Sequence, residues 1–92
     1  MESKNQTYGL SAENPVMVTS VAMSYSYLDK LITVHKDLSY RRIKSTFSSF
    51  VNGVLDKYEI LLNHEHYSFL FIYPYAEEDK FAMAETFETL RN

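Results

Sequence analysis

The sequence predicts a small α+β domain in the order helix, helix, β-hairpin, helix. Apolar residues recur every three or four positions over residues 15–58, and the period falls to two over residues 58–73. A final stretch with helical spacing follows a run of acidic residues. Ninety-two residues suffice for one domain with a thin core, so we expect a single domain over residues 14–92. Residues 1–13 are polar and aperiodic and are expected to form a flexible arm.

The first helix is expected over residues 15–36. Asn14 is a suitable N-cap, and Pro15 fits the first helical position. Apolar residues then follow at steps of three and four: Val18, Val21, Tyr25, Leu28 and Ile32. The β-branched residues of this stretch prefer strands, so an extra strand over residues 16–23 is the alternative, and the sequence leaves it open.

A second helix is expected to begin after Ser39, which can cap it. Its apolar residues fall on one narrow face, which is the strongest periodic signal of the chain. These residues are Tyr40, Ile43, Phe47, Phe50, Val51, Val54, Leu55 and Tyr58. Arg41 and Arg42 lie on the opposite face.

A β-hairpin is expected next, with residues 58–62 and 67–73 flanking a polar loop over residues 63–66. A four-residue loop directs Tyr58, Ile60, Phe69 and Phe71 toward the helices. The other face then carries Leu61, Leu70 and Ile72, which is more apolar than a solvent-exposed face requires. An isolated hairpin is marginally stable, so these three residues predict a homodimer interface.

The last helix is expected after Pro74, which cannot continue a strand. Glu77, Glu78 and Asp79 suit the first turn of this helix because acids complement its positive dipole end. Phe81 falls outside the apolar stripe that follows and is assigned to the interface with a partner.

The composition excludes several kinds of chemistry. The chain has no cysteine, so disulfides, thiolate nucleophiles and thiolate metal sites are excluded. Neither a nucleophile elbow nor a glycine-rich phosphate loop is present. His64 and His66 are metal-ligating types, but the sequence nominates no nearby third ligand. We therefore expect no enzyme, no cofactor and no metal.

A basic cluster formed by Lys36, Arg41, Arg42 and Lys44 is the sharpest charged feature. At a helix N-terminus these charges would oppose the helix dipole, so they favour contact with phosphate or with an acidic partner. Helices followed by a hairpin also match the order of a winged-helix module. The net charge of −3 argues against an extended nucleic-acid surface.

The expected function is a non-catalytic protein–protein interaction or regulatory module, homodimeric through its hairpin. The alternative is a small DNA- or RNA-binding regulator that uses the basic cluster. The chain has neither the apolar core of a signal peptide nor a stretch long enough to span a membrane, so a cytoplasmic location is expected.

Overall fold

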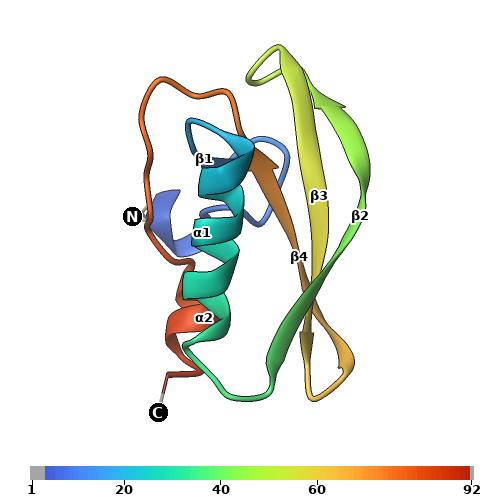
Figure 1. The fold of residues 1–92 in the computed structure, drawn as a ribbon, viewed down its shortest axis with the longest axis vertical. Coiled ribbons are helices and arrows are strands. Elements are labelled where there is room, and N and C mark those ends of the chain that lie inside the picture. Colours follow the sequence, from blue (N-terminus) through green and yellow to red (C-terminus); the bar gives the residue numbers. More distant parts are fainter. Residues whose placement is uncertain (1–3, 92) are drawn as a thin grey trace.

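One main helix packs against one face of a four-stranded mixed sheet in the computed structural model (Figure 1). The structure describes residues 4–91. Along the chain its elements are η1 (Lys4–Thr7), β1 (Val16–Met17), α1 (Val21–Ile32), β2 (Leu38–Ser48), β3 (Gly53–Leu62), β4 (Glu65–Tyr73) and α2 (Glu85–Glu88). The strand order is β1-β4-β3-β2, with β1 parallel to β4 and the other pairs antiparallel. The α+β class is confirmed, but the expected arrangement of two N-terminal helices and a hairpin is wrong.

The helix α1 is shorter than expected at both ends. Ser20 is its N-cap, and the Ser20 Oγ accepts a hydrogen bond from the Met23 amide at 3.1 Å. Its buried face carries Tyr27, Leu28 and Leu31, which belong to the hydrophobic core. The chain before Ser20 is extended, so the alternative of a strand is confirmed for Val16–Met17.

Strands β2 and β3 replace the expected second helix. The residues expected in that helix instead pair across an antiparallel hairpin, in which Tyr40 lies opposite Ile60. The run of serine and threonine over residues 45–49 has low helix propensity, because these side chains compete for backbone hydrogen bonds. Pairing with a distant strand therefore outweighs the local helical period.

The β3–β4 hairpin turns through two residues rather than four. Asn63 and His64 have φ values of 54° and 68°, the left-handed conformation that a tight hairpin turn of type I′ requires. A register shift after Ile60 then places Tyr58 opposite Leu70. Leu70 therefore lies on the core side of the sheet and is fully buried, as is Ile72, whereas Phe69 lies on the other side of the sheet. The expected face assignment of β4 is wrong because a one-residue slip inverts every side chain.

The C-terminal segment, residues 74–91, is mostly irregular instead of helical. Only Glu85–Glu88 form a helical turn. Three tyrosine hydroxyls hold this segment by donating to its backbone carbonyl oxygens: Tyr8 to Lys80 at 2.8 Å, Tyr27 to Ala82 at 2.7 Å and Tyr67 to Thr86 at 2.8 Å. We call Tyr8, Tyr27 and Tyr67 the tyrosine clamp. The clamp satisfies three carbonyl oxygens that a helix would otherwise pair, which offsets part of the cost of leaving this segment without regular structure.

The described part of the N-terminal segment also packs on the sheet, where a flexible arm was expected. Tyr8 is buried, and its hydroxyl accepts a hydrogen bond from the Met17 amide at 2.7 Å. The Phe71 amide donates to the Gly9 carbonyl oxygen at 2.8 Å. The expectation for residues 1–3 lies outside the described residues.

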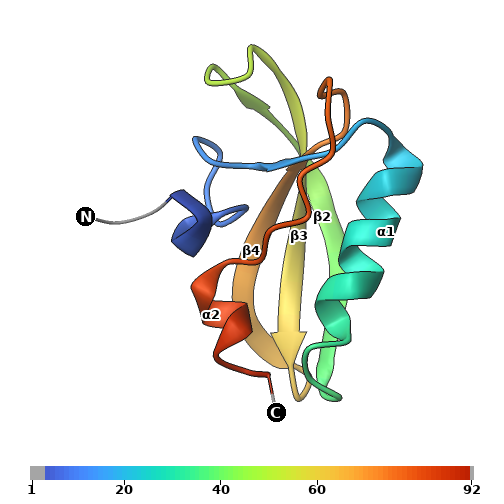
Figure 2. The ribbon, with the colours of Figure 1, turned by 90° about the vertical axis from the view of Figure 1, so that its left-hand side faces the viewer.

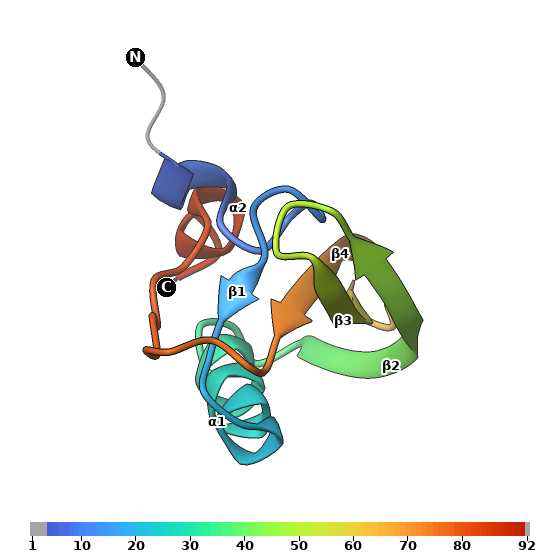
Figure 3. The same ribbon diagram turned by 90° about the horizontal axis from the view of Figure 1, so that it is seen from above.

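The core therefore lies between the sheet and a layer made of α1 and the two terminal segments. Figure 2 shows α1, α2 and the C-terminal segment on the same side of β2, β3 and β4, and Figure 3 shows this layering from above. The largest fully buried side chains of this core come from β1 and the residue after it, α1, β3, β4 and α2: Val16, Val18, Tyr27, Leu28, Leu31, Ile60, Leu70, Ile72 and Phe87.

We expect Gly9→Ala to destabilise the protein by about 2–4 kcal/mol. Gly9 has a φ of 85°, and an added Cβ would lie 2.7 Å from Val16 Cγ2 and 2.8 Å from Leu70 Cδ1. Urea unfolding measures the loss. Gly53→Ala is the matched control and should cost at most about 1 kcal/mol, because its Cβ would meet only the Tyr73 ring, at 3.1 Å. Equal losses in both variants would contradict this account.

We expect Tyr27→Phe to lower the free energy of unfolding by about 1–2 kcal/mol, because the Ala82 carbonyl loses its partner. Tyr75→Phe removes the hydroxyl of an exposed tyrosine and should change stability by less than about 0.5 kcal/mol. Thermal unfolding of both variants provides the comparison. A Tyr27→Phe variant as stable as the wild type would show that the hydrogen bond from Tyr27 to Ala82 contributes nothing to stability.

Candidate functional site

Exposed apolar side chains occupy the end of the β2–β3 hairpin and the start of the C-terminal segment. Phe47 is 63% exposed, Phe50 is 58%, Val54 is 50% and Tyr75 is 67%. Phe47 and Val54 lie directly opposite each other across the hairpin. Single exposed apolar residues are common, but large aromatic residues exposed together indicate an interaction surface.

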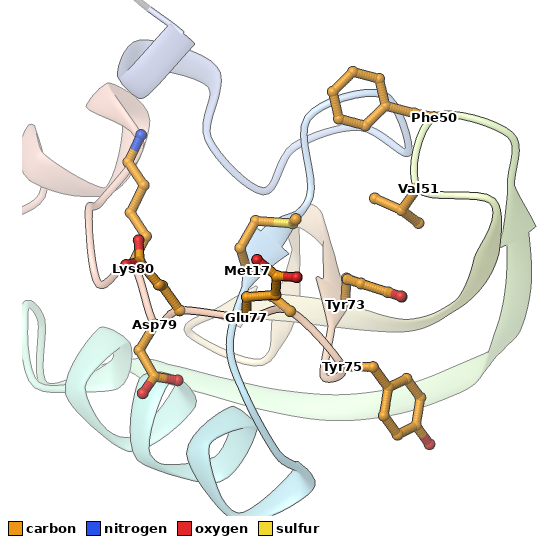
Figure 4. A pocket seen from close by; sticks show the side chains of 10 residues that line it. Met17, Phe50, Val51, Tyr73, Tyr75, Glu77, Asp79 and Lys80 are labelled. Atoms are coloured by element: carbon orange, nitrogen blue, oxygen red, sulfur yellow. The ribbon is translucent and has the colours of Figure 1, made fainter.

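An open groove of about 820 Å³ lies between the hairpin end and the C-terminal segment. We call it the tip groove. Five apolar or aromatic side chains and the five residues after Tyr75 line it: Met17, Phe50, Val51, Tyr73 and Tyr75, with Ala76, Glu77, Glu78, Asp79 and Lys80. Figure 4 shows Phe50 and Tyr75 on opposite sides of Val51 and Tyr73. The rings of Tyr73 and Tyr75 meet edge to face, with their centroids 5.9 Å apart.

Backbone hydrogen bonds hold the C-terminal wall of the tip groove. The Ala76 amide donates to the Val18 carbonyl oxygen at 2.9 Å, and the Lys80 amide donates to the Met17 carbonyl oxygen at 2.8 Å. The tyrosine clamp adds the Tyr8 hydroxyl, which donates to the Lys80 carbonyl oxygen. The wall is therefore fixed along its length although it contains neither helix nor strand.

The wall is acidic. The Asp79 carboxylate accepts two hydrogen bonds from Thr19. The Thr19 amide donates at 2.8 Å, and the Thr19 hydroxyl donates at 3.4 Å. The Lys80 Nζ lies 4.9 Å from the centroid of the Tyr8 ring. Glu77 and Glu78 are exposed, and neither forms an ion pair with another residue in the range 4–91. These acids were expected in the first turn of a helix, so the sequence missed the groove that they border.

The four residues expected at a homodimer interface do not share a surface. Leu70 and Ile72 are fully buried within the chain's own core. Leu61 is half-buried and lies on β3 opposite His66. Phe81 is half-buried, and its ring meets the Tyr27 ring edge to face at 5.7 Å. Homodimer formation stays a prediction, but Leu70 and Ile72 are not available to it.

The four basic residues lie on or near the edge strand β2, not on a helix. The Arg41 Nε is 2.6 Å from Glu59 Oε1, and the Arg42 Nη2 is 3.0 Å from Asp56 Oδ1. Adjacent strand residues point to opposite faces of a sheet, so Arg41 and Arg42 are separated. Lys36 and Lys44 are exposed, and Lys36 precedes the strand. The cluster therefore does not form one basic surface.

The sheet face opposite α1 carries a charged network around Glu59. The Glu59 side chain is only 9% exposed and contacts two basic residues. Arg41 lies beside its Oε1, and the His66 Nδ1 lies 2.6 Å from its Oε2. The Lys57 Nζ lies 4.1 Å from the centroid of the Phe69 ring. Two hydrogen bonds lower the pKa of the Glu59 carboxyl below its ordinary value. The bond from Arg41 has the larger effect, and the bond from His66 has the next largest.

No metal centre is found in the described part of the chain. Residues 4–91 contain no group of three or more histidine and acidic side chains placed to hold an ion. His64 occupies the β3–β4 turn, and His66 is bound to Glu59. Among the same residues, no helix is long and apolar enough to cross a membrane.

Comparisons of the chain with protein-family models, with curated proteins and with solved structures found no match. The site is therefore interpreted from its own geometry.

We expect Glu59→Gln to flatten the acid limb of the stability profile. Because the folded state lowers the pKa of Glu59, the unfolded chain binds the proton more readily. The stabilising contribution of Glu59 is present above its unfolded pKa, near 4.5, and is lost as the pH falls through the lower folded pKa. Urea unfolding between pH 3 and pH 7 tests this.

Glu78→Gln is the control, because Glu78 is exposed and its charge is removed without breaking an ion pair of the described structure. It should leave the acid limb as steep as in the wild type. An equally steep acid limb in Glu59→Gln would contradict the role assigned to Glu59.

Proposed function

We propose that this protein is a non-catalytic protein-binding module and that the tip groove is its binding surface. The observation that carries the proposal is the exposure of Phe50 and Tyr75 on either side of an apolar floor. Aromatic side chains are enriched among the residues that dominate binding energy at protein interfaces. Phe47 and Val54 extend the apolar surface along the hairpin.

The rigidity of one groove wall supports this proposal. Binding requires ordering of the surface, and a surface that is already ordered avoids much of that entropic cost. Hydrogen bonds to Met17 and Val18 fix the C-terminal wall before any partner arrives. The apolar floor contributes binding energy through loss of water, whereas the polar rim selects the partner.

A catalytic role is not proposed. Catalysis needs convergent groups of different roles around a reacting atom. The carboxylates of the tip groove follow one another on a single segment, and Glu77 and Glu78 are exposed to solvent. This arrangement suits recognition of charge better than proton transfer.

Nucleic-acid binding through the basic residues stays a prediction. Arg41 and Arg42 are each engaged with a carboxylate, so neither presents a free charge to phosphate. Lys36 and Lys44 are exposed, but two lysines provide few phosphate contacts. The geometry favours the tip groove over this second surface.

The double variant Phe50→Ser/Tyr75→Ser tests the proposal. Tagged wild-type and variant protein would be compared by capture and cross-linking in extract of the source organism. We expect a partner that the wild type retains to be lost from the double variant, at an unchanged melting temperature. The control Tyr25→Ser removes an exposed aromatic residue of α1 and should retain the partner.

A partner retained equally by wild type and double variant would contradict the proposed surface. If the captured partner is the chain itself, light scattering should show a dimer for the wild type and a monomer for the double variant. That outcome would place the predicted self-association on the tip groove.

A further inference from the structure

We infer that the tip groove binds an extended peptide segment in which basic and large apolar side chains alternate. This inference rests on the proposed function and adds the chemistry of the partner. Three features of the groove carry it: its apolar floor, its uncompensated acidic wall and its open shape.

The floor selects apolar side chains. Met17, Val51 and Tyr73 form it, and Phe50 and Tyr75 stand beside it (Figure 4). Pockets that enclose small molecules occupy roughly 300–1,000 Å³ and cover most of the ligand. The tip groove has a comparable volume of about 820 Å³ but is open to solvent. It therefore suits side chains that project from an extended backbone rather than an enclosed small molecule.

The wall selects positive charge. Asp79 is turned toward Thr19 and Lys80 toward Tyr8, so both are engaged within the chain. Figure 4 shows the Lys80 amine directed away from Tyr75. Glu77 and Glu78 are left as exposed carboxylates on the wall, without an ion pair in the described range. A basic side chain of the partner would supply the missing opposite charge.

Exposed aromatic rings add to the preference for a cation. The Tyr75 ring is 67% exposed beside the acidic wall, and its face attracts an ammonium or guanidinium group. The carboxylates of Glu77 and Glu78 disfavour binding of a nucleic acid, because they would repel its negatively charged phosphates. The chemistry of the groove thus distinguishes a basic peptide from an acidic one and from an oligonucleotide.

The experiment uses two matched peptides, one of alternating leucine and lysine and one of alternating leucine and glutamate. Each is titrated into the isotopically labelled full chain and followed by NMR. We expect the leucine–lysine peptide to shift the amide signals of Val51, Tyr75 and Ala76 and to bind about five- to tenfold more tightly than its counterpart. The difference should shrink at high salt.

The variant Glu77→Gln/Glu78→Gln should abolish the difference between the peptides. The control Glu85→Gln/Glu88→Gln changes the net charge equally on α2, outside the groove, and should preserve it. Equal affinity of both peptides for the wild-type groove would overturn the inference, as would an oligonucleotide that shifts the same groove signals.

These outcomes are separable from failure of the proposed function. Equal affinity of the peptides, with partner capture still lost in Phe50→Ser/Tyr75→Ser, would leave the protein-binding role in place and remove only the charge preference. Capture that survives the aromatic substitutions would contradict the tip groove as the binding surface.

Discussion

The tyrosine clamp is the constraint on which the rest of the structure depends. The C-terminal segment has almost no backbone ladder of its own, yet it supplies the fully buried Ala84 and Phe87 to the core. Hydroxyls from Tyr8, Tyr27 and Tyr67 fix it at three points along its length. Burial raises the pKa of Tyr8 and Tyr27, so these hydroxyls remain protonated donors far above neutral pH.

The clamp also links the core to the candidate site. Tyr8 joins the two terminal segments, since its hydroxyl accepts from Met17 and donates to Lys80. Met17 and Lys80 both line the tip groove. The groove is therefore built on the same hydrogen bonds that close the core. Phe50 and Tyr75, beside its floor, stay largely exposed.

Local patterns in the sequence predicted some elements and failed on others for identifiable reasons. The helix around Tyr27 and Leu28 was predicted because its apolar spacing and its packing agree. The spacing over residues 39–58 also fits a helix, but pairing between β2 and β3 decides the outcome, and no local signal reports it. The β4 side chains were inverted because a one-residue register shift follows Ile60, and no local signal in the sequence reports it.

The tip groove could not be predicted, because three distant segments build it. Met17, Phe50 and Tyr75 come together only when β1 has paired with β4 and the β2–β3 hairpin has formed. The acids over residues 77–79 were visible in the sequence, but they were assigned to the first turn of a helix and instead line the groove. The exposed Phe47 and Phe50 belong to the apolar spacing that was interpreted as the buried face of a helix.

The parallel pairing of β1 with β4 has a consequence for synthesis of the chain. Val16 pairs with Ile72, and the core beside them is closed by Phe87. A ribosome releases the N-terminal residues first, so Val16 must wait, without its native neighbours, until more than fifty later residues have emerged. Contacts between such distant positions form slowly. Before release, the growing chain therefore exposes the apolar side chains of β1 and α1, and a chaperone that shields them would act on this protein before its last segment is made.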